Sequence, residues 1–194
     1  MTEKDLFELK TLEVGTCENN CYLLICRKTR DAVIIDPAAD AEKIIRASKG
    51  LQVKYLLITH GHFDNIGALE MVKKETGAPV GINSSDASAL PFPPDFHLKE
   101  GDVIHFGQCS LKIIHTPGHT SGGVCMLIGE HLLSGDTIFP GGAGNTAIPG
   151  ANRSQILKSI REKLFTLPGD TIIHPGHGAT TTIERERSSS NYGR

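Results

Sequence analysis

Hydrophobic and polar positions divide the chain into two groups of strand-like segments, with helix-like segments following within each group. Short apolar runs that end at turn residues indicate strands, whereas apolar residues at a spacing of three to four indicate helices. The first group predicts strands at residues 7–14, 21–26, 32–35, 53–58 and 80–82, and helical segments at 41–48, 66–76 and 84–90. The second group predicts strands at residues 103–106, 109–115, 124–128, 131–133 and 171–174, and helical segments at 154–165 and 182–190.

Two segments between these elements are expected to be loops. Residues 91–94 read Pro-Phe-Pro-Pro, and no proline there can continue a helix. Residues 135–152 are glycine-rich and irregular, and a loop this long in a compact domain is usually functional or disordered. Because no linker separates the two strand groups, we predict one domain over residues 1–194. Its fold class is α/β, a four-layer αβ/βα sandwich of two sheets with helices outside.

The composition is that of an ordinary globular protein, with 39% hydrophobic and 22% charged residues in a chain of 194. A formal net charge of -2 gives no basic surface for nucleic acid or for an anionic membrane. The start of the chain is charged, and no apolar segment is long enough to span a membrane. We therefore expect a cytoplasmic protein with a small-molecule substrate, no nucleic-acid partner and no membrane partner.

Five cysteines are present, an odd number, and no pair has the Cys-x-x-Cys spacing. Cys21, Cys26, Cys109 and Cys125 lie in predicted strands, which favours buried reduced thiols over metal ligands or disulfides. Cys17 lies in a predicted turn and is expected to be exposed. We do not expect a catalytic cysteine.

The strongest candidate for chemistry follows the predicted strand at residues 53–58. His60, His62 and Asp64 are spaced two residues apart, so in an extended segment their side chains point the same way. Imidazole and carboxylate groups placed together at a strand end suit zinc or iron. The alternative is a polar loop in which Asp64 or Asn65 caps the following helix.

Three further loops place potential ligands directly after predicted strands. They contain the sequences His115-Thr116-Pro117-Gly118-His119, Gly135-Asp136 and His174-Pro175-Gly176-His177. Each alone fits an ordinary turn. Four such strand-end loops together are what a metal cluster at one edge of two packed sheets requires.

Taken in order, these motifs resemble the metallo-β-lactamase-fold hydrolase superfamily. The resemblance runs from Ile34-Ile35-Asp36-Pro37 through the histidine and aspartate motifs to Pro175-Gly176-His177-Gly178, and the later Thr-Thr-Ile-Glu-Arg-Glu-Arg is most similar to the glyoxalase II-like branch. It implies a first metal site of His60, His62 and His119 with Asp136 bridging. It implies a second site of Asp64, Asp136 and His177. The implied cofactor is zinc, as one or two ions, with iron also possible.

The chain departs from the family pattern in three places. The residue after the motif aspartate is a histidine of the second site in the family; here it is Asn65, whose neutral amide oxygen is a weaker ligand. We therefore expect the second site to be weak or empty at micromolar metal. Residues 144–147 lack the Arg and Asp usual in the glyoxalase II-like branch. Few residues follow His177, so the helical region that grips glutathione is not expected, and specificity for glutathione thioesters is not supported.

The resemblance implies a metallohydrolase of the hydroxyacylglutathione hydrolase type, which uses a metal-bound hydroxide on a small ester, thioester or amide. A bound divalent ion lowers the pKa of its water to about 7 and polarises a carbonyl oxygen. Asp64 and Asp136 are the candidate catalytic residues, because a carboxylate beside that water can orient it or accept its proton. Phe63 and the segments 91–96 and 141–152 are candidate substrate walls.

Three other functions remain open from the sequence. An iron-dependent sulfur dioxygenase acting on a persulfide would use His60, His119 and Asp136 as a mononuclear site. A nuclease of the superfamily is less well supported, because the chain has no basic face and no inserted nucleic-acid-binding domain. The non-enzymatic alternative is a degenerate relative that binds metal for structure or binds a partner protein. The sequence carries no signal for the oligomeric state.

The remaining histidines are weaker candidates. His115 and His174 lie beside the ligand loops, and each is a candidate to hydrogen-bond and orient a ligand imidazole. His97, His105 and His131 are expected to be ordinary surface or strand residues.

Overall fold

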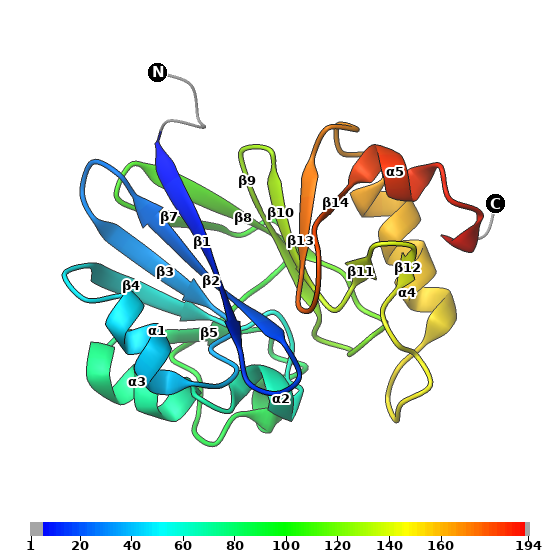
Figure 1. Ribbon diagram of the computed structural model, residues 1–194. Helices are drawn as coiled ribbons and strands as arrows, with labels where there is room; N and C mark the ends of the chain where they lie inside the picture. Colours follow the sequence, from blue (N-terminus) through cyan, green and yellow to red (C-terminus); the bar gives the residue numbers. More distant parts are fainter. Residues whose placement is uncertain (1–5, 193–194) are drawn as a thin grey trace.

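The computed structural model describes residues 6–192 and contains two six-stranded sheets packed face to face (Figure 1). In spatial order, the first sheet consists of β1 (Phe7–Val14), β2 (Asn19–Cys26), β3 (Asp31–Ile35), β4 (Gln52–Leu57), β5 (Val80–Ile82) and β6 (Phe96–His97). The second sheet consists of β14 (Thr181–Thr182), β13 (Ile172–Pro175), β10 (His131–Gly135), β9 (Val124–Ile128), β8 (Cys109–His115) and β7 (Val103–Phe106).

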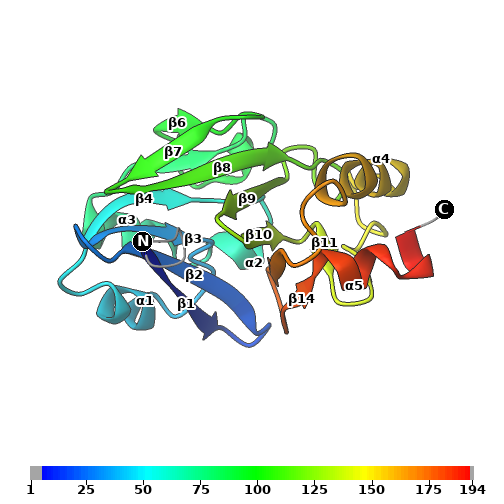
Figure 2. The ribbon, with the colours of Figure 1, turned by 90° about the horizontal axis from the view of Figure 1, so that it is seen from above.

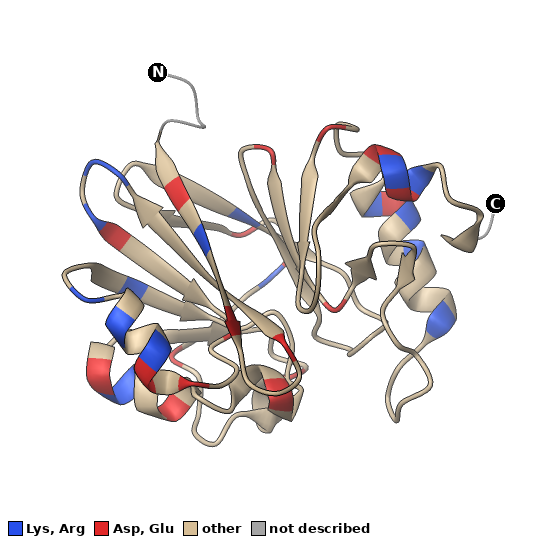
Figure 3. Ribbon diagram, viewed as in Figure 1, with Lys and Arg blue, Asp and Glu red and all other residues tan. Residues whose placement is uncertain are grey.

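Helices cover the outer face of each sheet. Helices α1 (Ala41–Ala47) and α3 (Leu69–Thr76) pack on the first sheet, while α4 (Arg153–Ser159) and α5 (Ile183–Arg187) pack on the second (Figures 1 and 2). Both Lys or Arg and Asp or Glu lie on α1, α3 and α5, whereas α4 carries only Arg and Lys (Figure 3). The predicted four-layer αβ/βα sandwich is confirmed. None of the described helices is long and apolar enough to cross a membrane.

Three hydrophobic clusters fill the three spaces between the four layers. Strand β2 contributes to two of them, because all eight of its residues are buried and successive side chains point to opposite faces. Leu23 and Ile25 face the α1 and α3 side, whereas Leu24 and Cys26 face the second sheet. The third cluster lies between the second sheet and the helices, and it includes Ile156, Ile160, Leu164, Leu132 and Ile173.

The helix predicted at residues 66–76 is two helices in the structure, α2 (Phe63–Ile66) and α3. The helix is interrupted because the amide of Ala68 donates to the carbonyls of Pro37 at 3.0 Å and Ala38 at 3.1 Å. Glycine at position 67 permits this approach, since a Cβ there would lie 2.6 Å from the carbonyl oxygen of Ala38. Since α2 begins at Phe63, Asp64 and Asn65 lie inside its first turn. The helix-cap role considered for these two side chains is wrong.

The other differences from the predicted elements are local. The helix predicted at 154–165 changes from α4 into a π-helical turn, η3 (Ile160–Leu164). The loop predicted at 135–152 contains a small hairpin of β11 (Ile138–Phe139) and β12 (Gly142–Ala143). Cys17 is exposed, and the other four cysteines are buried and free, as predicted.

The loops that follow β4, β8, β10 and β13 lie together where the two sheets meet. A backbone bond from the amide of Val124 to the carbonyl of Thr59, 2.9 Å long, joins the sheets at this edge. The isolated bridge between Asn19 and His177 joins them again. Side chains from both halves of the chain therefore reach one place.

Candidate metal centre

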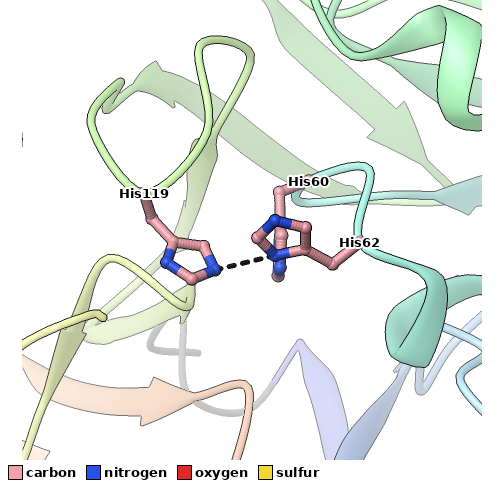
Figure 4. Close-up of side chains that lie close together, drawn as sticks. All are labelled: His60, His62 and His119. Atoms are coloured by element: carbon pink, nitrogen blue, oxygen red, sulfur yellow. Dashed lines mark hydrogen bonds between the residues drawn. The ribbon is translucent and has the colours of Figure 1, made fainter. Parts of the chain in front are cut away.

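Three imidazoles converge at this edge, and one ligand atom from each lies within 4.8 Å of the others (Figure 4). His60 follows β4, His62 precedes α2, and His119 comes from the loop between β8 and β9. Their ring centroids are 4.6 to 4.9 Å apart, and His60 and His119 are buried. The sequence placed these three residues on one site, and the structure brings them together.

Hydrogen bonds on the far side of the rings direct lone pairs toward a common point. The Nδ1–H of His119 donates to the carbonyl oxygen of Asn145 at 2.8 Å, which leaves Nε2 as an acceptor. That Nε2 faces Nδ1 of His62 at 2.9 Å (Figure 4). Two imidazole nitrogens that face each other in this way are the arrangement in which a shared cation replaces a proton.

His60 is oriented through Thr59 and Asp36. The Thr59 hydroxyl donates to Oδ2 of Asp36 at 2.7 Å and lies 3.1 Å from Nδ1 of His60. The Thr59 amide donates to Oδ1 of the same carboxyl group at 2.8 Å. Burial raises the pKa of Asp36 to about 7, with the bonds from Thr59 opposing that shift. His60 thus has a fixed ring plane before any ion binds.

Electrostatics keep the three imidazoles neutral at pH 7. Burial lowers the pKa of His60 well below its usual value, and the neighbouring His119 and His62 rings lower it further. Burial also lowers the pKa of His62 and of His119. Because only a neutral imidazole can bind a metal, this environment favours metal binding over protonation.

Asp136 supplies negative charge beside the imidazoles. Its Oδ2 lies 3.5 Å from Nε2 of His119 and 3.7 Å from Nε2 of His177, and burial raises its pKa to about 6. Among the described residues its buried Oδ1 has no hydrogen-bond partner. A buried carboxylate oxygen without a partner is costly unless a cation satisfies it. These residues therefore fit a zinc or iron ion.

Glycines hold the backbone close to Asp136. A Cβ at position 176 would lie 2.2 Å from its Oδ1, and one at position 144 would meet its carbonyl oxygen. Only a residue without a side chain can occupy either place. Gly176 belongs to the predicted Pro-Gly-His-Gly motif, and this contact explains why that motif needs its first glycine.

His177 follows β13 of the second sheet and is held by residues at the start of β2 and in the turn before it. Its Nδ1–H donates to the carbonyl of Cys17 at 3.0 Å, and its Nε2 lies 3.5 Å from Oδ2 of Asp64. The Asn20 side chain donates to the carbonyls of Pro175 at 3.0 Å and Gly178 at 2.9 Å. Sequence reasoning missed Asn20. The available signal was a polar pair at the start of an otherwise apolar strand.

Asp86 was also missed, although it links two ligand loops. Its carboxylate accepts from the Gly61 amide at 3.0 Å, the Thr120 hydroxyl at 2.6 Å and the Gly122 amide at 2.8 Å. Gly61 lies between two of the ligand histidines, and Thr120 follows His119. One buried carboxylate therefore sets the spacing between the loop after β4 and the loop after β8.

The orienting roles predicted for His115 and His174 are wrong. His115 Nε2 bonds the carbonyl of Ser121 at 3.0 Å, and His174 Nε2 pairs with Nδ1 of His131 at 2.9 Å. Both histidines are therefore committed to groups other than a ligand imidazole.

Of the predicted substrate walls, Phe63 is exposed, whereas the aromatic residues of segment 91–96 pack against other residues. Phe63 is 85% exposed beside the histidine loop, which leaves its ring available to a ligand. In segment 91–96, however, Phe92 packs against the cluster under α1 and α3, and Phe96 packs against Tyr55. The aromatic rings of that segment thus serve the core.

Comparison with known proteins agrees with this geometry. Residues 14–177 match the family model described as the metallo-beta-lactamase superfamily, and the chain belongs to that family. The hydroxyacylglutathione hydrolase GloC of Haemophilus influenzae is 34% identical, over 95% of this chain and 97% of its own length. The human mitochondrial persulfide dioxygenase ETHE1 is 32% identical, over 86% of this chain and 68% of its own. The solved structure of TTHA1623 in a di-iron-bound form has a TM-score of 0.82 at 30% identity, covering 93% and 98% of the two chains.

The fold, the histidine cluster and these relatives define a metal enzyme of the metallo-β-lactamase fold. The relatives include both a hydrolase and a dioxygenase, so the reaction has to be argued from the site itself.

Proposed function

We propose that the protein is a metal-dependent hydrolase of a small ester, thioester or amide, with thioesters as the first class to test. The observation that supports it most directly is the convergence of three neutral imidazoles beside a buried carboxylate, with Nε2 of His119 3.5 Å from Oδ2 of Asp136. Similarity to a hydroxyacylglutathione hydrolase over nearly the whole of both chains supports the thioester class.

In this proposal His60, His62 and His119, with Asp136, hold one zinc or iron ion. When bound, such an ion lowers the pKa of a water molecule to about 7 and polarises a carbonyl oxygen. Asp64 provides a carboxylate whose side chain is 44% exposed and whose Oδ2 lies 3.5 Å from Nε2 of His177. It orients the attacking water and accepts its proton. The exposed ring of Phe63 offers an apolar surface to the acyl group.

The test uses protein stripped with a chelator and reloaded with zinc or iron(II). We expect hydrolysis of a hydroxyacylglutathione thioester by the reloaded protein, and loss of that activity in the stripped protein. A thioester of a simple thiol, assayed in parallel, shows whether glutathione is recognised. A fully metallated protein that hydrolyses no ester, thioester or amide would contradict the proposal.

A second candidate is an iron-dependent persulfide dioxygenase, which the human relative favours. This reaction would use His60, His119 and Asp136 with iron(II). The protein is loaded with iron(II) under anaerobic conditions, and its oxygen uptake is then measured with glutathione persulfide. Uptake of oxygen identifies the dioxygenase and separates it from the hydrolase. Zinc-loaded protein serves as the control, because zinc has no redox chemistry.

A further inference from the structure

A second group of polar side chains lies beside the three imidazoles and has an amide group in its midst. We call Asn19, Asp64, Asn65 and His177 the amide cluster. The Nδ2 of Asn19 lies 3.4 Å from Oδ2 of Asp64, 3.3 Å from Oδ1 of Asn65 and 3.5 Å from Nε2 of His177. One NH2 group thus faces three acceptors, which share its two hydrogens.

Asn65 is turned so that it supports this arrangement. It is 1% exposed, and its Nδ2 lies 2.8 Å from Nδ1 and 3.0 Å from Nε2 of His60. The two imidazole nitrogens direct their lone pairs or hydrogens away from each other. The Asn65 NH2 group is nearly equidistant from both nitrogens of His60 and therefore lies against the face of the ring. The nitrogen end of Asn65 is therefore committed to His60, and its oxygen end points to Asn19.

The backbone fixes the position of Asn19. It is the first residue of β2, it pairs with Val14 of β1, and it forms the isolated bridge with His177. Its side chain is 3% exposed, between the two sheets. His177 is oriented as an acceptor for the Asn19 amide. Its Nδ1–H donates to the carbonyl of Cys17, so only Nε2 remains to accept.

An NH2 group and a metal ion compete for the same lone pairs. An amide nitrogen can only donate, so its hydrogens point at the acceptors that an ion would need. Removing those bonds in a buried place costs free energy, and Asn65 offers only a neutral oxygen in return. A second ion would therefore find the lone pairs of Asp64 and His177 already hydrogen-bonded to Asn19. The lone pairs of the imidazole cluster face no such donor from Asn19 and remain available to the first ion.

We propose that the hydrogen bonds from Asn19 to Asp64, Asn65 and His177 replace a second metal ion, and that this protein binds a single ion at His60, His62 and His119. The proposal rests on the metal site of the proposed function and not on its reaction. Metal is counted without substrate, so a failed count and a failed hydrolysis assay are distinguishable.

The experiment is a zinc titration by calorimetry of chelator-stripped protein, with elemental analysis after gel filtration. The unmodified protein is expected to bind one zinc ion. Asn19→Asp is isosteric and converts the donor into an anionic oxygen, and Asn65→His supplies an imidazole. The double variant is expected to bind two ions, with the second at least about tenfold tighter than in Asn65→His alone.

Gln52→Glu is the matched control, since it makes the same amide-to-carboxylate change at an exposed residue at the start of β4, and it should bind one ion. Two tight zinc ions in the unmodified protein would overturn the proposal, because the Asn19 amide would then have its oxygen toward the cluster. A folded double variant that binds one ion would overturn it as well.

If the double variant does not fold, Asn19→Asp alone decides the matter. It must gain a second, weaker zinc-binding event that the unmodified protein and Gln52→Glu lack. No gain would overturn the proposal.

Discussion

Two groups of histidines in this protein are alike in composition and differ in their surroundings. The rings of His60, His62 and His119 lie within 4.9 Å of one another, and those of His131 and His174 lie 5.1 Å apart. The first group lies beside a buried carboxylate, with Nε2 of His119 3.5 Å from Oδ2 of Asp136. The second is packed edge-on by the rings of Phe7 and Tyr22.

Proximity of imidazoles therefore does not by itself make a metal site. In the first group, bonds on the outer side of the rings leave lone pairs directed inward, beside a negative charge. In the second pair, Nδ1 of His131 faces Nε2 of His174 at 2.9 Å, and Nδ1 of His174 is buried without a hydrogen-bond partner among the described residues. This pair offers two imidazoles, whereas the first group brings three together beside a carboxylate.

Removing one imidazole from each group should give the largest contrast. His119→Ala is expected to lower metal affinity and turnover by more than about 100-fold. Loss of a residue that only hydrogen-bonds a metal ligand has a smaller effect, about 10-fold to 100-fold. His131→Ala should keep full metal content. Elemental analysis and a thioester assay measure both, with circular dichroism to verify folding. Near-normal metal in His119→Ala would refute the assignment.

Asp136→Asn makes the first group resemble the second, with imidazoles but no carboxylate. We expect metal affinity to fall about 100-fold, because the neutral amide cannot offset the charge of a cation and its NH2 points at acceptors. Calorimetric zinc titration of both proteins gives the ratio. Unchanged affinity would show that the Asp136 carboxylate plays no part in metal binding.

The pair of His131 and His174 should contribute to the pH dependence of the free energy of unfolding. Burial lowers the pKa of His174 to about 4, with His131 adding to the shift, whereas an unfolded histidine titrates near 6.5. The unfolded state therefore binds more protons between these values, and stability falls as the pH drops from 6.5 toward 4. The expected loss is up to roughly 3 kcal/mol.

Urea unfolding of metal-free protein at several pH values measures this slope. His174→Phe should reduce the slope by the share of His174, since an apolar ring has no proton to gain. The slope that remains is that of His60, His62 and His119, whose pKa values are also lowered by burial. The exposed His97→Gln serves as the control and should keep the full slope. An equal slope in His174→Phe would assign the pH dependence to other groups.

Asp86 tests whether the first group depends on loop spacing as well as on its ligands. Asp86→Asn retains one acceptor and loses the other, so the bonds to Gly61 and Thr120 weaken. Zinc affinity is expected to fall by about 10-fold to 100-fold. Asp95→Asn, at an exposed carboxylate paired with Lys73, should leave zinc affinity unchanged. Equal affinities in the two variants would remove Asp86 from the metal centre.

Much of the fold could be predicted because strands with strong local patterns dominate it. β1, β5, β7, β8 and β9 have the bounds that the apolar runs predicted. The two-residue strands β6, β11, β12 and β14 could not, because their pairing partners rather than their own residues define them. The break at Gly67 depends on the approach of Ala38, which lies far away in the sequence.

The candidate site likewise contains residues that could be predicted from local sequence and residues that could not. His60, His62 and His119 were predicted because each lies after a strand in a recognisable motif. Asn19 and Asp86 were missed because they act through hydrogen bonds to residues 25 to 158 positions away. Spacing within one segment gives no information on such contacts. Asn65 was noticed as a departure from the family pattern, but its contact with His60 required the structure.

The attachment of His177 to β2 has a consequence for biosynthesis. The bond between Cys17 and His177 spans 160 positions, and Asn20 and Tyr22 bind the carbonyl of Pro175 across similar separations. Closing so long a span costs chain entropy, and such contacts form late. A chain emerging from the ribosome exposes His60, His62 and His119 well before His177. We therefore expect the nascent chain to be able to capture an ion before its first and last strands have joined.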